Sequence, residues 1–258
     1  MSKIIAVANQ KGGVGKTTTS VNLSAALAAL GYRVLLVDLD AQGNATMGCG
    51  VDKQQLSVSA YDVLTGRGFI RDAIVSVDED GLDVLPGNSD LTAVQVELMN
   101  QIGRERVLSE ALAICRDDYD FILIDCPPAL NILTLNALVS ADSVLIPMQC
   151  EYYALEGLSD LMDTLRSVQD MINPDLAIEG VLRTMFDNRS RLTADVSAQL
   201  IEHFADLVFE TVVPRNVRLA EAPSHGKSIV KYDRGSRGGQ SYLALAEEVV
   251  RRNRQDLH

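Results

Sequence analysis

Short apolar runs alternate along the chain with longer segments in which apolar and polar positions are mixed. The runs predict strands over residues 3–9, 33–38, 82–86, 121–125, 143–147, 178–185 and 208–213. The longer segments, bounded by turn residues, predict helices over residues 16–30, 104–116, 155–171, 192–204 and 240–252. Because strands and helices alternate, we expect an α/β fold with a mostly parallel, twisted sheet and helices on both faces.

The carboxyl ends of the strands are where such a sheet places a ligand site. The loops after residues 9, 38, 125 and 185 are therefore the places to look for chemistry. The stretch 48–80 is the least regular, and we expect an insertion with helical turns there. The length of 258 residues fits a single domain over residues 1–258.

Composition agrees with a buried parallel sheet, since 47% of the residues are apolar and tryptophan is absent. The four cysteines form no Cys-x-x-Cys pair, so we expect them to be reduced. The first residues run into a strand without the layout of a signal peptide, and no apolar stretch approaches the ~20 residues of a membrane span. We therefore expect a cytoplasmic protein.

A glycine-rich segment between the first strand and the first helix carries the clearest chemical signal. It reads Lys11-Gly12-Gly13-Val14-Gly15-Lys16-Thr17-Thr18, a modified form of the phosphate-binding pattern Gly-x-x-x-x-Gly-Lys-[Ser/Thr]. Glycines let backbone N–H groups turn toward one anion, and the helix start adds its positive dipole end. We expect a P-loop NTPase in which Lys16 contacts the β- and γ-phosphates and the Thr17 hydroxyl ligates Mg²⁺.

Lys11 adds a second cation at the start of this loop. Because Lys16 already fills the usual role inside one subunit, we expect Lys11 to reach a γ-phosphate held by a second subunit. There it would stabilise the charge that develops during phosphoryl transfer, as an arginine finger does. The alternative is a solvated lysine on the loop surface.

Acidic residues follow two of the predicted strands. Asp38 and Asp40 lie at the end of the second strand, and strand alternation would place both side chains on one side of an extended chain. Asp125 ends the strand 121–125, a Walker B arrangement in which the acid holds a water on Mg²⁺. We expect Asp40 to position the attacking water and Asp38 to support the metal shell. Helix capping or turn formation is the alternative role for such acids.

These motifs, together with two later segments, resemble those of the ParA/Soj group of partitioning ATPases, which have a deviant Walker A loop. The later segments are 149–157 and 214–224, and they are more specific to Soj-like proteins than the phosphate loop. The resemblance spans nearly the whole chain and implies an ATPase of weak intrinsic turnover that uses ATP and Mg²⁺. It also implies that the adenine lies near Met185, Pro214, Arg215 and Asn216.

The same resemblance implies a cycle of assembly that partitions DNA during chromosome segregation. ATP would join two copies into a sandwich homodimer in which Lys11 reaches the partner's phosphates and Asp40 supports hydrolysis. The dimer would bind double-stranded DNA without sequence preference, and a ParB-type centromere-binding protein would stimulate hydrolysis and release it. The protein would be nucleoid-associated in the cytoplasm, with no membrane partner.

Charge is distributed unevenly along the chain. The net charge is −12, yet residues 215–254 hold nine basic and four acidic residues, a local charge of +5. Charge alone favours a solvated surface with ordinary ion pairs, whereas the resemblance favours contacts to DNA phosphates. The residues expected to contact DNA are Arg189, Arg218, Lys227 and Arg237, with Arg191 and Arg215 in reserve.

Three other interpretations compete with this one. A membrane-associated ATPase of the MinD type needs a terminal amphipathic helix, but residues 251–258 have almost no apolar face. An iron–sulfur reductase needs two cysteines per subunit gathered at a dimer axis. A scaffold that binds ATP without turnover would release no phosphate even with DNA and partner present.

Overall fold

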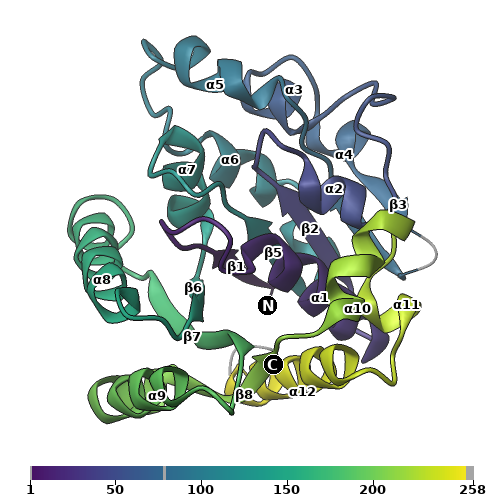
Figure 1. The fold of residues 1–258 in the computed structure, drawn as a ribbon. Helices are drawn as coiled ribbons and strands as arrows, with labels where there is room; N and C mark the ends of the chain where they lie inside the picture. The colour runs from purple at the N-terminus through teal and green to yellow at the C-terminus, as the bar shows by residue number, and fades with distance from the viewer. Residues whose placement is uncertain (1, 78–79, 254–258) are drawn as a thin grey trace.

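The computed structural model describes residues 2–77 and 80–253, and its strands form one eight-stranded sheet (Figure 1). The strand order is β3-β4-β2-β5-β1-β6-β7-β8. All neighbours pair in parallel except β3, which runs antiparallel to β4. The strands are β1 (Lys3–Val7), β2 (Val34–Asp38), β3 (Val75–Val77), β4 (Leu82–Leu85), β5 (Phe121–Asp125), β6 (Ser143–Gln149), β7 (Ala177–Phe186) and β8 (Val208–Pro214).

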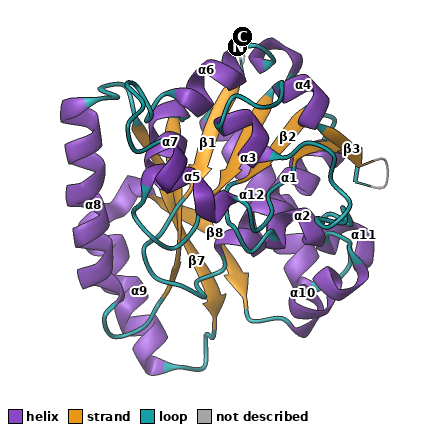
Figure 2. Cartoon of the chain, turned by 90° about the horizontal axis from the view of Figure 1, so that it is seen from above, coloured by secondary structure: helices purple, strands orange, loops and turns teal. Residues whose placement is uncertain are grey.

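Helices cover both faces of this sheet, so the expected α/β fold is confirmed (Figure 2). Within the described residues, no helix is both long enough and apolar enough to cross a membrane. The helices are α1 (Lys16–Ala29), α2 (Asn44–Gly48), α3 (Ala60–Leu64), α4 (Ile70–Ala73), α5 (Leu91–Glu97), α6 (Val107–Ala113), α7 (Ile132–Ser140), α8 (Ala154–Met171), α9 (Arg191–Phe204), α10 (Val217–Glu221), α11 (Ile229–Tyr232) and α12 (Arg237–Arg252).

The core has two halves because successive strand residues point to opposite faces. In β1, Ile5 and Val7 join the apolar cluster of α1, α11 and α12, whereas Ile4 and Ala6 join that of α3 to α9. Both clusters consist mainly of fully buried aliphatic side chains. Burial on both faces explains why the strands are continuous apolar runs.

Some elements differ from the expectation. The region 48–80 contains α3 and α4 as expected helical turns but also the edge strand β3, and the helix expected over 104–116 is only α6 followed by a 3₁₀ turn. α5 and α7 were not expected. α7 reads ILTLNALVS, which is apolar around most of its circumference, so it carries no amphipathic period. Its start is fixed by Asn131, whose side chain accepts hydrogen bonds from Leu133 N and Thr134 N.

The registers of the central strands set the place of the site. Val7 of β1 and Asp38 of β2 are both paired with Asp125 of β5. The carboxyl ends of β1, β2 and β5 therefore lie at the same level, and the loops that follow them meet at one edge of the sheet. The expected loops after β1, β2 and β5 share this edge.

A buried carboxylate on α12 accepts hydrogen bonds from the backbone of the edge strand β8. Glu248 is 2% exposed and accepts hydrogen bonds from Glu210 N, Thr211 N and the Arg252 guanidinium, each at 2.9 Å. The two amides are available because the pairing of β7 with β8 is irregular. Burial acts to raise the pKa of Glu248, but the hydrogen bonds and Arg252 outweigh it, so the pKa lies below its usual value.

We expect Glu248→Gln to lower the free energy of unfolding at pH 7 by about 3 kcal/mol, because a buried charge-assisted network loses its anion. The pKa of Glu248 is lower in the folded state than in the unfolded state, where it is ~4.3. The ionised side chain therefore contributes its full stabilisation of the folded state above the unfolded pKa, and this contribution is lost as the pH falls through the folded pKa. The difference between variant and wild type should therefore shrink below about pH 4. Urea unfolding between pH 7 and pH 3.5 measures this, with the exposed Glu247→Gln as control; a difference that stays constant contradicts the assignment.

Candidate functional site

The backbone of the glycine-rich loop between β1 and α1 is open to a ligand. Gly13 and Gly15 adopt left-handed conformations with φ of +74° and +90°, which favour glycine. No other atom lies within 4 Å of the position that a Cβ would take at Gly12 or Gly13. An anionic group can therefore approach this backbone closely at the start of α1.

Hydrogen bonds of Asn9 and of Thr184 hold the loop against the neighbouring strands β6 and β7. The Asn9 amide donates to Pro147 O of β6 at 2.8 Å, and its oxygen accepts from Lys11 N at 2.9 Å. The Thr184 hydroxyl of β7, which is buried, donates to Val14 O at 2.7 Å. Asn9 and Thr184 were not among the expected site residues. The position of Asn9 at the end of a predicted strand could have suggested its role, whereas no local sequence pattern identified Thr184.

Lys16 lies largely buried at the start of α1, and its ammonium donates to Lys11 O at 3.1 Å. Burial lowers its pKa, and the nearby charge of Asp125 acts in the opposite direction. A buried lysine beside an acid and over an open loop backbone can neutralise a phosphate group.

Asp125 and two hydroxyls of α1 form the deepest part of the site. Thr17 Oγ1 donates to one carboxylate oxygen at 2.8 Å, and Ser20 Oγ donates to the other at 2.8 Å. Asp125 is fully buried, and burial, followed by the charge of Asp38, raises its pKa to about 8. The hydroxyl and carboxylate oxygens at Thr17 and Asp125 are ligands that Mg²⁺ prefers. Ser20 was not expected in this group.

The Asp38 carboxylate is hydrogen-bonded to residues that follow β2 in the chain. Its carboxylate accepts from Thr46 N at 2.8 Å, from Thr46 Oγ1 at 2.7 Å and from Asp40 N at 3.1 Å. Burial raises its pKa to about 6. Both carboxylate oxygens are thus bonded to the segment that leads into α2. Asp38 therefore affects Asp125 through its charge, while its hydrogen bonds hold the segment after β2 in position.

Asp40 lies in the turn after β2 and is only partly buried, with one oxygen accepting from Gln42 N at 2.9 Å. Strand alternation does not set the direction of the Asp40 side chain, because β2 ends at Asp38. Asp38 is instead fully buried, while Asp40 keeps access to solvent. A partly exposed carboxylate near the phosphate loop is suited to bind water.

Lys11 has an ion-pair partner inside the same subunit. Its ammonium is 2.5 Å from the Glu151 carboxylate, just after β6, and both side chains are about half exposed. The adjacent Tyr152 and Tyr153 are 75% and 70% exposed and pack edge to face with ring centres 4.9 Å apart. Exposed aromatic side chains beside a cation indicate a contact surface.

A cavity of about 150 Å³ adjoins the loop on the side of β7 and β8. It brings together the four residues expected around a base, and Met185 among them has a strained φ of +48°. Its mainly apolar walls with a few polar groups suit a flat heterocycle. The lining residues are Gly15, Thr18, Thr184, Met185, Val213, Pro214, Arg215, Asn216, Leu219, Ala220 and Tyr242.

The basic residues expected to contact DNA belong to different elements and loops. Arg189 follows β7 and pairs with Asp187 at 3.0 Å, whereas Arg218 on α10 pairs with Glu221 at 2.9 Å. Lys227 lines a cavity of about 270 Å³ beside the start of α1, and Arg237 begins α12. Three of the four thus belong to the segment from α10 to α12, and Arg189 stands apart in sequence.

The cysteines do not favour the iron–sulfur interpretation. All four cysteines are free and buried, and burial raises the pKa of the Cys126 thiol, so none is a ready iron ligand. Within residues 2–77 and 80–253, no cluster of three or more His, Cys, Asp or Glu side chains is arranged to hold a metal. The end of the tail that a MinD-type interpretation concerns, residues 254–258, lies outside the described residues.

We expect Thr184→Val to weaken nucleotide binding about tenfold, because Val14 O loses a buried hydrogen bond and the loop loses its tether to β7. Thr184→Ser keeps the hydroxyl and should bind as the wild type does. Titration with a fluorescent ATP analogue gives the dissociation constants, and circular dichroism confirms folding. Equal affinity of the Val and Ser variants would show that this tether does not shape the site.

Comparison with known proteins identifies the family. A model described as an AAA domain matches residues 2–178. The chain is 55% identical to the sporulation initiation inhibitor protein Soj of Bacillus subtilis, over 97% of this chain and 99% of that protein. It is 49% identical to the chromosome partitioning protein ParA of Caulobacter vibrioides, over 98% and 95% of the two chains.

Solved structures agree with the fold. A cobyrinic acid a,c-diamide synthase of Mycobacterium smegmatis with bound ADP and magnesium matches with a TM-score of 0.87 and 38% identity, over 99% and 97% of the two chains. The cell division ATPase MinD of Pyrococcus furiosus matches with a TM-score of 0.81 and 31% identity, over 97% and 99%. The family model and the extended identity to Soj and ParA show that this chain belongs to the ParA/Soj-type ATPases.

Proposed function

We propose that this chain is a DNA-partitioning ATPase that works in chromosome segregation and is switched by its nucleotide between a monomer and a sandwich dimer. The observation that carries the proposal is the position of Lys11. This cation is half exposed, belongs to the same loop as the buried Lys16, and neighbours an exposed pair of tyrosines. A second copy on this surface would receive a cation at its own nucleotide.

ATP and Mg²⁺ fit the residues present. The mycobacterial neighbour with ADP and magnesium supports this pairing of ligands, and the names of the Soj and ParA relatives support the role in partitioning. Oxygen donors at Thr17 and Asp125 would hold the metal, which neutralises charge on the phosphate oxygens when bound. The cavity beside Met185 and Pro214 would hold the adenine.

In this proposal the site residues have separate roles. Lys16 and the loop amides bind the phosphates, and the Thr184 tether keeps the loop in shape. Asp40 holds the attacking water, since it is the acid with access to solvent. Lys11 leaves Glu151 and stabilises charge on the partner's γ-phosphate. A ParB-type protein stimulates this step and so releases the dimer from DNA.

We expect Asp40→Ala to form an ATP dimer that does not return to the monomer, because the variant binds nucleotide but cannot position the water. Light scattering with ATP and with ADP measures the mass, and phosphate release measures turnover. Lys16→Ala is the control: it should lose nucleotide binding and stay monomeric. If Asp40→Ala remains monomeric with saturating ATP, its assigned role is wrong. If the wild type releases no phosphate even with DNA and partner, the chain is a scaffold.

DNA binding follows from dimerisation, because two weakly basic patches on one duplex gain avidity. Arg189, Arg218, Lys227 and Arg237 supply the patch in this proposal, with local ion pairs at Arg189 and Arg218 to be exchanged for phosphates.

For the Asp40→Ala dimer with ATP, we expect Arg237→Ala to reduce the slope of log affinity against log salt by about 1 for each DNA phosphate that the arginine no longer neutralises, on any DNA sequence. Arg166→Ala on α8, also an exposed arginine, is the matched control. Fluorescence anisotropy with two unrelated duplexes at several salt concentrations gives the slopes. Equal slopes in the two variants would remove Arg237 from the patch.

A further inference from the structure

The loop that follows β4 lies beside the turn that carries Asp40. Val37 of β2 is the register partner of Leu85 of β4, so the carboxyl ends of these two strands lie at the same level. The chain leaves β2 through residues 39–43 and β4 through residues 86–90. The two loops therefore meet at the edge of the sheet where the candidate site lies.

Thr46 joins the two loops from the inside, although it is 41 residues from its partner Gly87 in the sequence. Its buried hydroxyl donates to the Asp38 carboxylate at 2.7 Å and accepts a hydrogen bond from Gly87 N at 2.9 Å. Thr46 N also donates to Asp38 at 2.8 Å. A buried hydroxyl with a partner on each side fixes the distance between the end of β2 and the loop after β4.

Close backbone contacts leave the Asp40 turn little room to move. Gly43 has a φ of +60°, and a Cβ there would lie 2.7 Å from Gly87 O. A Cβ at Gly87 would lie 2.5 Å from Asp38 O. Only glycine permits an approach this close at both positions. The turn is thus pressed directly against the loop after β4.

Lys53 holds the same turn from the outside. Its ammonium donates to Gln42 O, and its Cδ lies 2.7 Å from the position that a Cβ would take at Gly43. The aliphatic stem of this partly exposed lysine therefore covers the glycine. Gln42 N in turn donates to the Asp40 carboxylate at 2.9 Å. Lys53 thus holds the residue that orients the Asp40 side chain.

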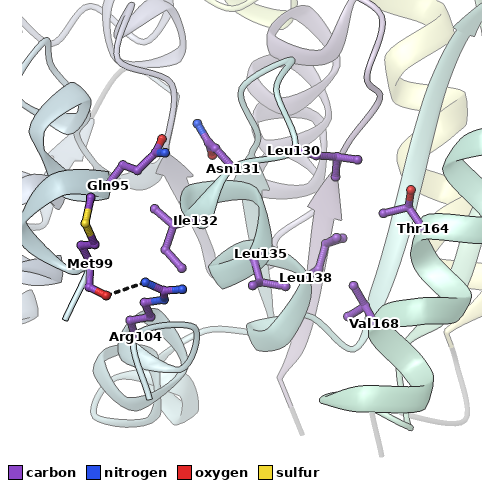
Figure 3. Close-up of a pocket in the computed structure, with 10 residues that line it drawn as sticks. All are labelled: Gln95, Met99, Arg104, Leu130, Asn131, Ile132, Leu135, Leu138, Thr164 and Val168. Atoms are coloured by element: carbon purple, nitrogen blue, oxygen red, sulfur yellow. Dashed lines mark hydrogen bonds between the residues drawn. The ribbon is translucent and has the colours of Figure 1, made fainter. Parts of the chain in front are cut away.

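The loop after β4 is itself anchored by helices. Pro86 O accepts a hydrogen bond from Ala60 N of α3 at 2.8 Å, and the loop continues into α5, whose Leu91 and Val94 are buried in the core. The exposed side of α5 faces a groove of about 390 Å³ that α7 and α8 also line (Figure 3). Because packed helices hold it, the loop can serve as the fixed side of the contact with the Asp40 turn.

We propose that Thr46 and Lys53 are positioning residues for ATP hydrolysis, which clasp the turn 40–46 against Gly87 and so hold Asp40 where it binds the attacking water. This inference rests on the proposed function, which gives Asp40 that role. It adds two residues that act on hydrolysis through Asp40. A displacement of about 1 Å at such a group can cost on the order of 100-fold in rate.

The test compares Thr46→Val, which removes the hydroxyl with little change in shape, with Thr46→Ser, which keeps it. Lys53→Met removes the donor and keeps an aliphatic side chain, and Gln54→Ala changes its exposed neighbour as the control. Hydrolysis of ATP with Mg²⁺ in a single turnover, with protein in excess, gives the rate of the chemical step. Titration with a fluorescent ATP analogue gives the dissociation constant, and circular dichroism confirms folding.

We expect Thr46→Val and Lys53→Met to hydrolyse ATP about tenfold more slowly or worse, with dissociation constants within about twofold of the wild type. Thr46→Ser and Gln54→Ala should hydrolyse ATP nearly as fast as the wild type. A loss of affinity as large as the loss of rate would overturn the inference, because the two residues would then serve binding. If Thr46→Val does not fold, Lys53→Met at the surface decides alone.

Asp40→Ala in the same assay separates this inference from the proposed function. If Asp40→Ala is inactive while Thr46→Val and Lys53→Met hydrolyse ATP normally, the clasp does not position Asp40, and the proposed function stands. If Asp40→Ala hydrolyses ATP as the wild type does, the role of Asp40 in the proposed function fails, and this inference fails with it.

Discussion

The site depends on two carboxylates buried side by side at the carboxyl edge of the sheet. Asp38 and Asp125 are register partners on β2 and β5, both are fully buried, and burial raises the pKa of each. Lys16 acts on Asp125, but burial lowers its own pKa as well. A cation bound between Asp125 and Thr17 would keep the acids ionised. The metal ion of a bound metal–nucleotide complex would therefore supply the positive charge that balances the two buried acids at this edge of the sheet.

The phosphate loop is shaped by its neighbours as much as by its own glycines. Gly13 and Gly15 permit the turns, but the hydrogen bonds from Asn9 to β6 and from Thr184 of β7 to Val14 determine the position of the loop. Thr184 is followed directly by the strained Met185, which lines the cavity proposed for the base. The loop tether and the cavity proposed for the base thus belong to one continuous piece of structure, so distortion at the end of β7 would reach both.

The sequence allowed the sheet, the phosphate loop and the three acids to be predicted, because each is recorded in a local pattern. Lys16 and Thr17 stand in a motif, and Asp125 ends an apolar strand. Thr184 had no such pattern, since its partner Val14 lies 170 residues away and the contact exists only through the strand order. α7 was missed for the opposite reason: a helix buried on most sides carries no periodic signal.

Lys11 has a partner, Glu151, that lies far from it in the sequence. Its ion pair with Glu151 is half exposed, and pairs of this kind contribute at most about 1 kcal/mol in water. A triphosphate from a second copy carries more negative charge than one carboxylate and would sit in a water-poor interface, where the same lysine interacts far more strongly. In the proposed dimer, Glu151 would therefore bind Lys11 weakly enough to be displaced. It would hold Lys11 in place before assembly and compete little for it afterwards, as a reversible nucleotide switch requires.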